Sequence, residues 1–125
     1  MLNDGILNRL QRKINKDCTV ETQKVVALAT IGKNLFSFDV NRRGEGIISD
    51  FSTHAEERLV NKLRKINAQY RFRDKLTFFV IRFRRIGGLG LAKPCDGCKN
   101  LLRYNGIKEI FYSTNEGSFE RMRLC

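Results

Sequence analysis

One run near the middle of the chain, KLTFFVIRF (75–83), is almost continuously apolar. A strand that shows one face to water alternates apolar and polar residues, whereas a strand covered on both faces reads as an unbroken apolar run. This run therefore predicts a central strand. It constrains the fold more than any other segment, because the rest of the chain has to cover both faces of its sheet.

Patterns elsewhere in the chain supply the covering layers. Apolar spacing and turn residues predict helices over 4–17, 53–66 and 94–105, and strands over 24–31, 35–40, 75–83, 107–113 and 118–124. The third helix is expected to open at Pro94, a favoured first-turn residue, and 41–51 is expected to be a loop. A chain of 125 residues can bury a stable core without disulfides or a structural metal. We expect one domain, 1–125.

Helices that alternate with strands indicate an α/β fold. We expect three layers, α/β/α, with a mixed five-stranded sheet and helices on both of its faces. The first two strands should form a hairpin, because only a short turn at 32–34 separates them. The helical crossovers predict parallel pairing around the central strand.

The chain is strongly basic, with a formal net charge of +11. Excess positive charge attracts phosphate-bearing partners without identifying one of them. No run approaches the roughly 20 apolar residues of a membrane span, and no secretory signal is visible, so we expect an intracellular, cytoplasmic protein without membrane association. A nuclear or mitochondrial location stays open, and the basic amphipathic segment 7–16 would suit a mitochondrial presequence.

Two short motifs carry the chemistry, STHAEERLV (52–60) and AKPCDGCKNLL (92–102). Together they hold the only histidine, His54, and the pair Cys95 and Cys98 at the start of a predicted helix, where the helix dipole favours thiolate. One imidazole and two thiolates make three zinc ligands, and a catalytic zinc site keeps its fourth position for water. Glu56 would then carry protons between that water and a substrate.

Each motif also has a simpler interpretation. Thr53 and Glu56 have the spacing of a capping box, and a lone C-x-x-C is often half of a structural zinc site or a redox pair. A structural zinc needs a fourth protein ligand, but only Cys18 and Cys125 remain, and we expect both to be bystanders. A redox pair would leave the nearby His54 and Glu56 unexplained, so we favour the catalytic zinc site.

The two motifs resemble the signature of the zinc-dependent cytidine/deoxycytidylate deaminase superfamily, H-x-E followed by P-C-x-x-C. The segment 106–113 also resembles the strand after the zinc helix in dCMP-type members, and the order of elements matches from about residue 4 to 123. The resemblance implies a cytidine-deaminase-like fold and one zinc per chain. The zinc ligands that it implies are His54, Cys95 and Cys98, with Glu56 as the catalytic proton carrier.

The resemblance also implies substrate contacts and a branch of the superfamily. The backbone N–H of Ala55 would bind the base, and Asn41 resembles an asparagine that contacts the sugar or base. Free cytidine deaminases usually carry Cys in place of His54 and an Arg-Gln pair in place of Lys99-Asn100, so the chain looks closer to the dCMP-type and polynucleotide branches. The extra length and extra metal residues of many deoxycytidylate deaminases are absent.

Basic residues flank the expected site and guide the choice of substrate. Arg42 and Arg43 adjoin Asn41, and Arg84 and Arg85 follow the central strand, where ligands of open α/β sheets bind. With aromatic residues interleaved, these four arginines would suit a single strand of nucleic acid.

We therefore predict deamination of cytosine to uracil in single-stranded DNA or RNA. Free cytidine or a cytosine nucleotide is the alternative substrate, and other amino-substituted rings stay open. A non-catalytic, zinc-stabilised nucleic-acid-binding module is the non-enzymatic alternative. The last predicted strand, 118–124, leaves little chain for a covering helix, so a second copy of the chain could pair with this sheet edge.

Overall fold

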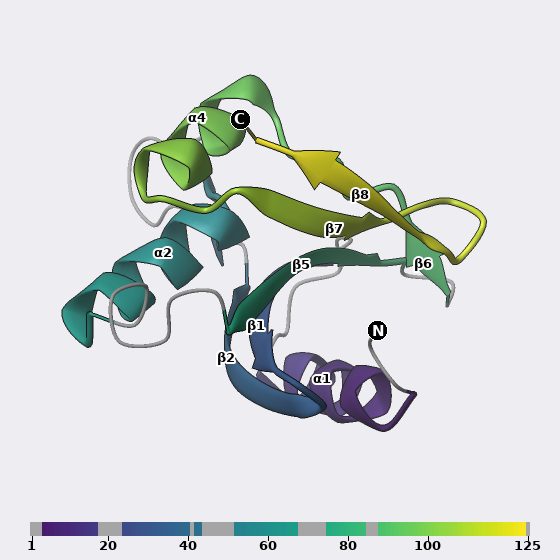
Figure 1. Cartoon of the computed structure of the whole chain (residues 1–125). Coiled ribbons are helices and arrows are strands. Elements are labelled where there is room, and N and C mark those ends of the chain that lie inside the picture. The colour runs from purple at the N-terminus through teal and green to yellow at the C-terminus, as the bar shows by residue number, and fades with distance from the viewer. Residues whose placement is uncertain are drawn as a thin grey trace.

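A computed structural model describes residues 4–17, 24–40, 42–43, 52–67, 75–84 and 88–124 (Figure 1). Its elements are α1 (Asp4–Asp17), β1 (Lys24–Ile31), β2 (Asn34–Val40), β3 (Arg42–Arg43), β4 (Ser52–Thr53), α2 (Ala55–Lys65), β5 (Leu76–Phe83), β6 (Leu89–Gly90), α4 (Asp96–Tyr104), β7 (Glu109–Ser113) and β8 (Phe119–Arg123). Every predicted helix and strand is therefore present. None of the helices in these ranges has the length and apolar content needed to cross a bilayer.

The sheet is mixed and has the strand order β2-β1-β5-β7-β8, with the short strand β6 added beside β5. The five predicted strands are confirmed, and the short strand β6 was not predicted. Strands β5 and β7 are parallel, as predicted, but β1 and β5 are antiparallel. The prediction of parallel pairing on both sides was wrong because the α2 crossover from β2 passes over β1, which places β5 next to a strand of opposite direction.

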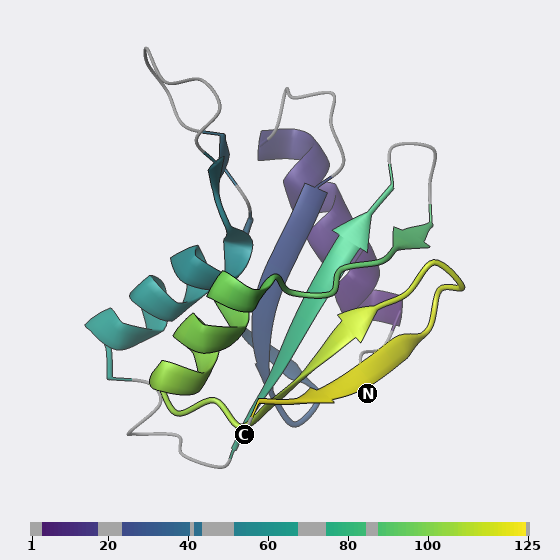
Figure 2. The same ribbon diagram turned by 90° about the horizontal axis from the view of Figure 1, so that it is seen from above.

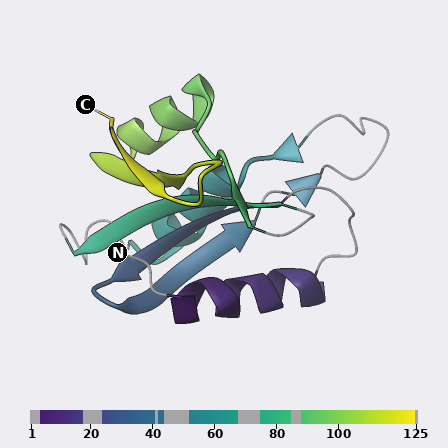
Figure 3. The ribbon, with the colours of Figure 1, turned by 90° about the vertical axis from the view of Figure 1, so that its right-hand side faces the viewer.

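Helices cover both faces of the sheet, as predicted. On β1, Val26 and Leu28 pack with α1, whereas Ala27 and Ala29 pack with α2. The small alanine side chains on the second face let α2 lie close to the sheet. Figure 3 shows α1 on the opposite side of the sheet from α4, and Figure 2 shows α2 and α4 next to each other, in agreement with their direct contacts.

The central strand β5 contributes to both layers. Phe79 and Ile81 belong to the core beneath α1, and Val80, which points to the other face, packs with residues of α2 and α4. All three side chains are buried. The continuous apolar run therefore reflects burial on both faces, which was the premise of the predicted fold.

Two predicted boundaries differ from the structure. Strand β3 lies within the predicted loop 41–51 and pairs with β4, directly after that loop, to form a separate two-stranded ribbon. The third helix begins at Asp96 with Cys95 as its N-cap, so Pro94 lies before the cap and outside the first turn. Proline suits this position as well, because the extended chain that enters a helix needs no N–H donor from it.

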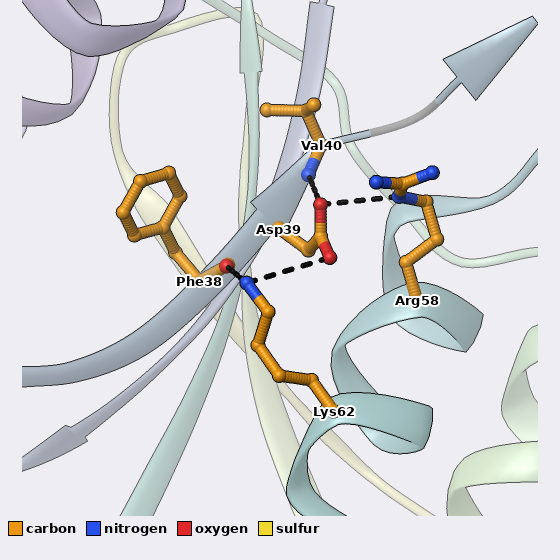
Figure 4. A network of polar contacts seen from close by, with 5 residues as sticks. All are labelled: Phe38, Asp39, Val40, Arg58 and Lys62. Atoms are coloured by element: carbon orange, nitrogen blue, oxygen red, sulfur yellow. Dashed lines mark hydrogen bonds and ion pairs between the residues drawn. The ribbon is translucent and has the colours of Figure 1, made fainter.

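A polar network docks α2 against β2 (Figure 4). The Nε of Arg58 lies 3.1 Å from Asp39 Oδ1, and Lys62 Nζ lies 3.5 Å from Asp39 Oδ2. Lys62 also donates to the carbonyl oxygen of Phe38 at 2.8 Å, and the N–H of Val40 donates to Asp39 Oδ1 at 2.9 Å. The Asp39 carboxylate, whose side chain is only 14% exposed, thus orients the helix that begins beside His54.

Replacing Asp39 with alanine is expected to lower the free energy of unfolding by about 1 kcal/mol, because two cations lose a shared partner while Lys62 stays half in water. Urea titration followed by circular dichroism measures this change. Glu109→Gln is the matched control, because it removes the exposed Glu109–Arg121 pair between β7 and β8 and should cost less than about 0.5 kcal/mol. Equal costs for the two variants would contradict a special role for Asp39.

Candidate metal centre

The three candidate ligands lie at the starts of two adjacent helices. His54 is the N-cap of α2 and Cys95 is the N-cap of α4, and neither side chain caps its own helix. Cys98 lies three residues further along α4 and is buried. Because β2 leads into α2 and β5 leads into α4 at the same end of the sheet, residues more than 40 positions apart meet here.

The ligand atoms lie close enough together to share one metal ion. His54 Nδ1 lies 3.2 Å from Cys98 Sγ and 3.9 Å from Cys95 Sγ, and all three atoms lie within 4.8 Å of one another. Zinc–nitrogen and zinc–sulfur bonds of about 2.0 and 2.3 Å at tetrahedral angles separate such atoms by about 3.5–3.8 Å. Three ligands of this kind fit zinc and leave one tetrahedral position for another molecule.

The start of α2 excludes the capping-box interpretation. A capping box joins the N-cap residue to the third helical residue. The cap here is His54, so Thr53 lies outside the helix and Glu56 is its second residue. The carboxyl group of Glu56 is therefore free of that structural role.

Glu56 lies next to the ligands and is only 5% exposed. Burial raises the pKa of the Cys98 thiol, and the negative charge of Glu56 and a hydrogen bond with Cys95 raise it further. Glu56 also lines the same pocket as His54 and Cys95, so it lies beside the cluster. A bound divalent cation would reverse the balance, since it stabilises the thiolate and offsets the neighbouring negative charge.

A pocket of about 240 Å³ opens beside the cluster. Its wall is formed by Val25, His54, Ala55, Glu56, Val80, Arg82, Leu91, Ala92, Lys93, Pro94 and Cys95. Pockets for drug-sized ligands have volumes of roughly 300–1,000 Å³, so this one suits a single small ring with its substituents. The pocket is lined by two of the candidate metal ligands, His54 and Cys95, and by the buried carboxylate of Glu56. A metal ion and a carboxylate are the groups needed to activate a water molecule for attack on a bound ring.

The structure places the predicted site residues in three groups. His54, Ala55, Glu56 and Cys95 line the pocket, and Cys98 joins the ligand cluster. Arg84 lies outside the pocket wall, where its guanidinium donates to Asn115 Oδ1 at 2.8 Å. The predictions for Asn41, Arg85, Cys18 and Cys125 fall outside the described residues, as do those for the side chains of Arg42 and Arg43, whose backbone forms β3.

Two cationic residues of the pocket were not chosen as site residues from the sequence. Arg82 belongs to the same basic cluster as Arg84, and Lys93 precedes the cysteine motif. The sequence does contain information that places Arg82. Side chains two residues apart in a strand point to the same face, so Arg82 shares the face of Val80 on β5. That signal becomes informative only when the face covered by α2 and α4 is known.

The raised thiol pKa predicts a pH-dependent zinc affinity. Zinc binds the thiolate, so binding displaces the proton that Cys98 holds below its raised pKa. We expect the apparent Kd for zinc to rise by at least about tenfold for each pH unit from about pH 8 down to about pH 6. Competition against a chelating dye, calibrated separately at each pH, measures this dependence. An affinity that is constant over this range would show that Cys98 is not a ligand.

Comparisons with known proteins connect this geometry to a known fold. No protein-family model and no curated protein matches the chain. Among solved structures, cytidine deaminase from Burkholderia pseudomallei superposes with a TM-score of 0.61 at 16% identity, over 98% of this chain and 94% of the other. Cytidine deaminase from Mycobacterium leprae gives a TM-score of 0.54 at 19% identity, over 99% and 95% of the two chains. The chain therefore has the three-layer fold of the cytidine deaminases, as predicted from the sequence.

Proposed function

We propose that the protein is a zinc-dependent hydrolytic deaminase that converts cytosine to uracil. The observation that carries this proposal is the meeting of His54, Cys95 and Cys98 in one cluster, with the buried carboxylate of Glu56 beside it in the wall of a pocket for one ring. A zinc site that served only to hold the fold together would have no use for that carboxylate or for a neighbouring pocket.

Metal binding, proton transfer and base binding would be carried out by different residues of the site. His54, Cys95 and Cys98 would hold the zinc, which when bound lowers the pKa of a water molecule towards about 7. Glu56 would take one proton from the attacking water and deliver it to the ring nitrogen. It would then move the remaining proton of the added hydroxyl to the amine, which leaves as ammonia. The N–H of Ala55 has no partner within the helix, because it lies in the first turn of α2, and it can donate to the base.

The proposed substrate is cytosine in a single strand of DNA or RNA. A net charge of +11 favours a polyanion, and a pocket of about 240 Å³ accepts one base that has left its stack. Free cytidine is the second candidate, because the two solved structures with this fold are named cytidine deaminases. An intracellular location belongs to the same proposal, since reducing compartments keep zinc-binding thiols free.

A substrate panel on one zinc-quantified sample tests the proposal. Cytidine, deoxycytidine monophosphate, single-stranded DNA and RNA and their adenine equivalents are incubated with the protein, and ammonia release is measured at several salt concentrations. We expect uracil to form in the strands, with a rate that falls steeply as salt rises. Turnover of free cytidine with little salt dependence would select the second candidate. Absence of turnover on every cytosine substrate, with stoichiometric zinc present, would refute the proposed activity.

A further inference from the structure

Arg82 is a pocket residue for which the reaction described above has no use. It lies at the carboxyl end of β5, paired with Val25 of β1 on one side and with Gly90 of β6 on the other. Val80, two residues earlier, packs beneath α2 and α4, so Arg82 shares the face of the sheet on which the candidate metal centre lies. Its guanidinium therefore borders the space where a substrate would bind.

Within the described part of the chain, the guanidinium has only one weak hydrogen bond. Its Nε is buried and has no hydrogen-bond partner among the residues that the structure describes, and its Nη1 lies 3.5 Å from the carbonyl oxygen of Leu91, at the limit of a hydrogen bond. Among the ion pairs that join described residues, none involves Arg82, although Glu56 lines the same pocket. A partly buried cation without an anion costs free energy, so this arrangement favours a ligand that brings one.

The backbone around Arg82 is fixed by hydrogen bonds. The Oγ of Ser113, which is fully buried, accepts from the Arg82 N–H at 3.0 Å and donates to the carbonyl oxygen of Gly90 at 2.7 Å. The Ala92 N–H donates to the carbonyl oxygen of Ser113 at 2.9 Å. These bonds join β5, β6 and β7 at one point. The backbone that carries the Arg82 side chain is therefore held in a fixed position.

Gly90 leaves room for the path of the side chain. A Cβ at Gly90 would lie 3.3 Å from Arg82 Cδ and 3.4 Å from Arg84 Cγ, closer than a comfortable contact. The missing side chain thus lets Arg82 cross β6 along the pocket wall. A second cation, the exposed Lys93, lines the same pocket.

We propose that Arg82, assisted by Lys93, binds a phosphate group of the substrate while the base reaches the candidate metal centre. The proposal rests on the proposed function and specifies its substrate as a phosphate ester of a cytosine nucleoside. Phosphate matches the guanidinium because two parallel N–H donors can bind two of its oxygens. Two sources share this chemistry, the monoester of a free nucleotide and the diester of a strand.

Binding measurements on the zinc-loaded full chain test the phosphate site separately from turnover. The ligands are deoxycytidine, its 5′-monophosphate, and a short thymine strand with one central cytosine. Isothermal titration compares the protein with and without Arg82→Gln, in a Glu56→Gln background so that no ligand is consumed. Arg103→Gln is the matched control, because it removes the same charge from an exposed position on α4, where Arg103 contacts Asn100.

We expect at least one phosphate ligand to bind roughly tenfold to hundredfold more tightly than deoxycytidine, the gain typical of hydrogen bonds to a charged group. Arg82→Gln should remove this advantage and leave deoxycytidine binding unchanged, whereas Arg103→Gln should preserve it. An advantage for the monophosphate identifies a free nucleotide as the source. An advantage for the strand alone identifies the diester backbone.

Other outcomes overturn the phosphate site or separate it from the proposed activity. Equal losses in Arg82→Gln and Arg103→Gln, or no phosphate advantage in the parent protein, would overturn it. A fall in zinc content in Arg82→Gln would show that Arg82 serves the metal ligands instead. If Arg82→Gln fails to fold, Arg82→Lys decides, since it keeps the charge but loses the two-donor geometry and should lose part of the advantage. Phosphate binding without any deamination would refute the proposed activity and leave the phosphate site standing.

Discussion

Replacing Glu56 with glutamine is expected to lower kcat by roughly 10²–10⁴-fold while the zinc content stays at one ion per chain. Glutamine has nearly the same shape but cannot accept a proton from water or deliver one to the ring. The metal should stay bound, because the charge of Glu56 raises the pKa of the Cys98 thiol and its removal therefore favours the thiolate. Steady-state kinetics and metal analysis on the same sample measure both effects.

Glu57→Gln is the matched control for this substitution. Glu57 follows Glu56 on α2 and also lies in its first turn, but its side chain is exposed. We expect its kcat to stay within about twofold of the parent protein, since surface substitutions rarely disturb a site. Wild-type activity in Glu56→Gln would exclude the catalytic role of the carboxylate. A non-catalytic zinc-stabilised module would instead bind zinc and show no turnover in either protein.

The second large effect is expected at Cys98. Replacing it with serine should reduce bound zinc from one ion per chain to background and abolish deamination, because a hydroxyl is a poor substitute for a thiolate ligand. Zinc should also stabilise the parent protein, by about 4 kcal/mol at a free concentration of 1,000 Kd, and this gain should be absent in the variant. Metal analysis and thermal melts with and without added zinc measure the two quantities.

The two remaining cysteines provide a control that also tests the number of ligands. Cys18→Ser and Cys125→Ser should each retain one zinc and full activity, because three protein ligands complete a catalytic site. Loss of zinc in either variant would indicate a fourth protein ligand and a structural site. The same result would contradict an open coordination position and, with it, the proposed reaction.

The metal-site motifs could be interpreted from the sequence because their information is local. His54 and Glu56 occupy one helix start, and Cys95 and Cys98 occupy another, so each pair has nearly the same geometry in any fold that keeps the helix. The strand and helix ranges were accessible for the same reason. The residue types indicate which atoms can bind a metal, and the spacing indicates which residues lie on the same face of a helix or strand.

The choice among the arginines required the tertiary structure. Arg82 and Arg84 are two residues apart and lie on the same face of an extended chain, so the sequence offers no reason to prefer one of them. In the fold, Arg82 pairs with Gly90 within the sheet and borders the pocket, whereas Arg84 lies past the end of β5 and binds Asn115. The partners that separate them come from β6 and from the turn after β7.

By itself, the sequence determined the central strand, the covering helices and the donor atoms for a metal, because burial, periodicity and ligand chemistry are properties of short segments. The tertiary structure alone decided that β1 runs antiparallel to β5, that β6 joins the sheet, and that the pocket is bordered by a guanidinium without an ion pair among the described residues. The physical reason is that strand direction and side-chain environment depend on which distant segments pack together. Those pairings are set by the free energy of the whole core, which no single segment contains.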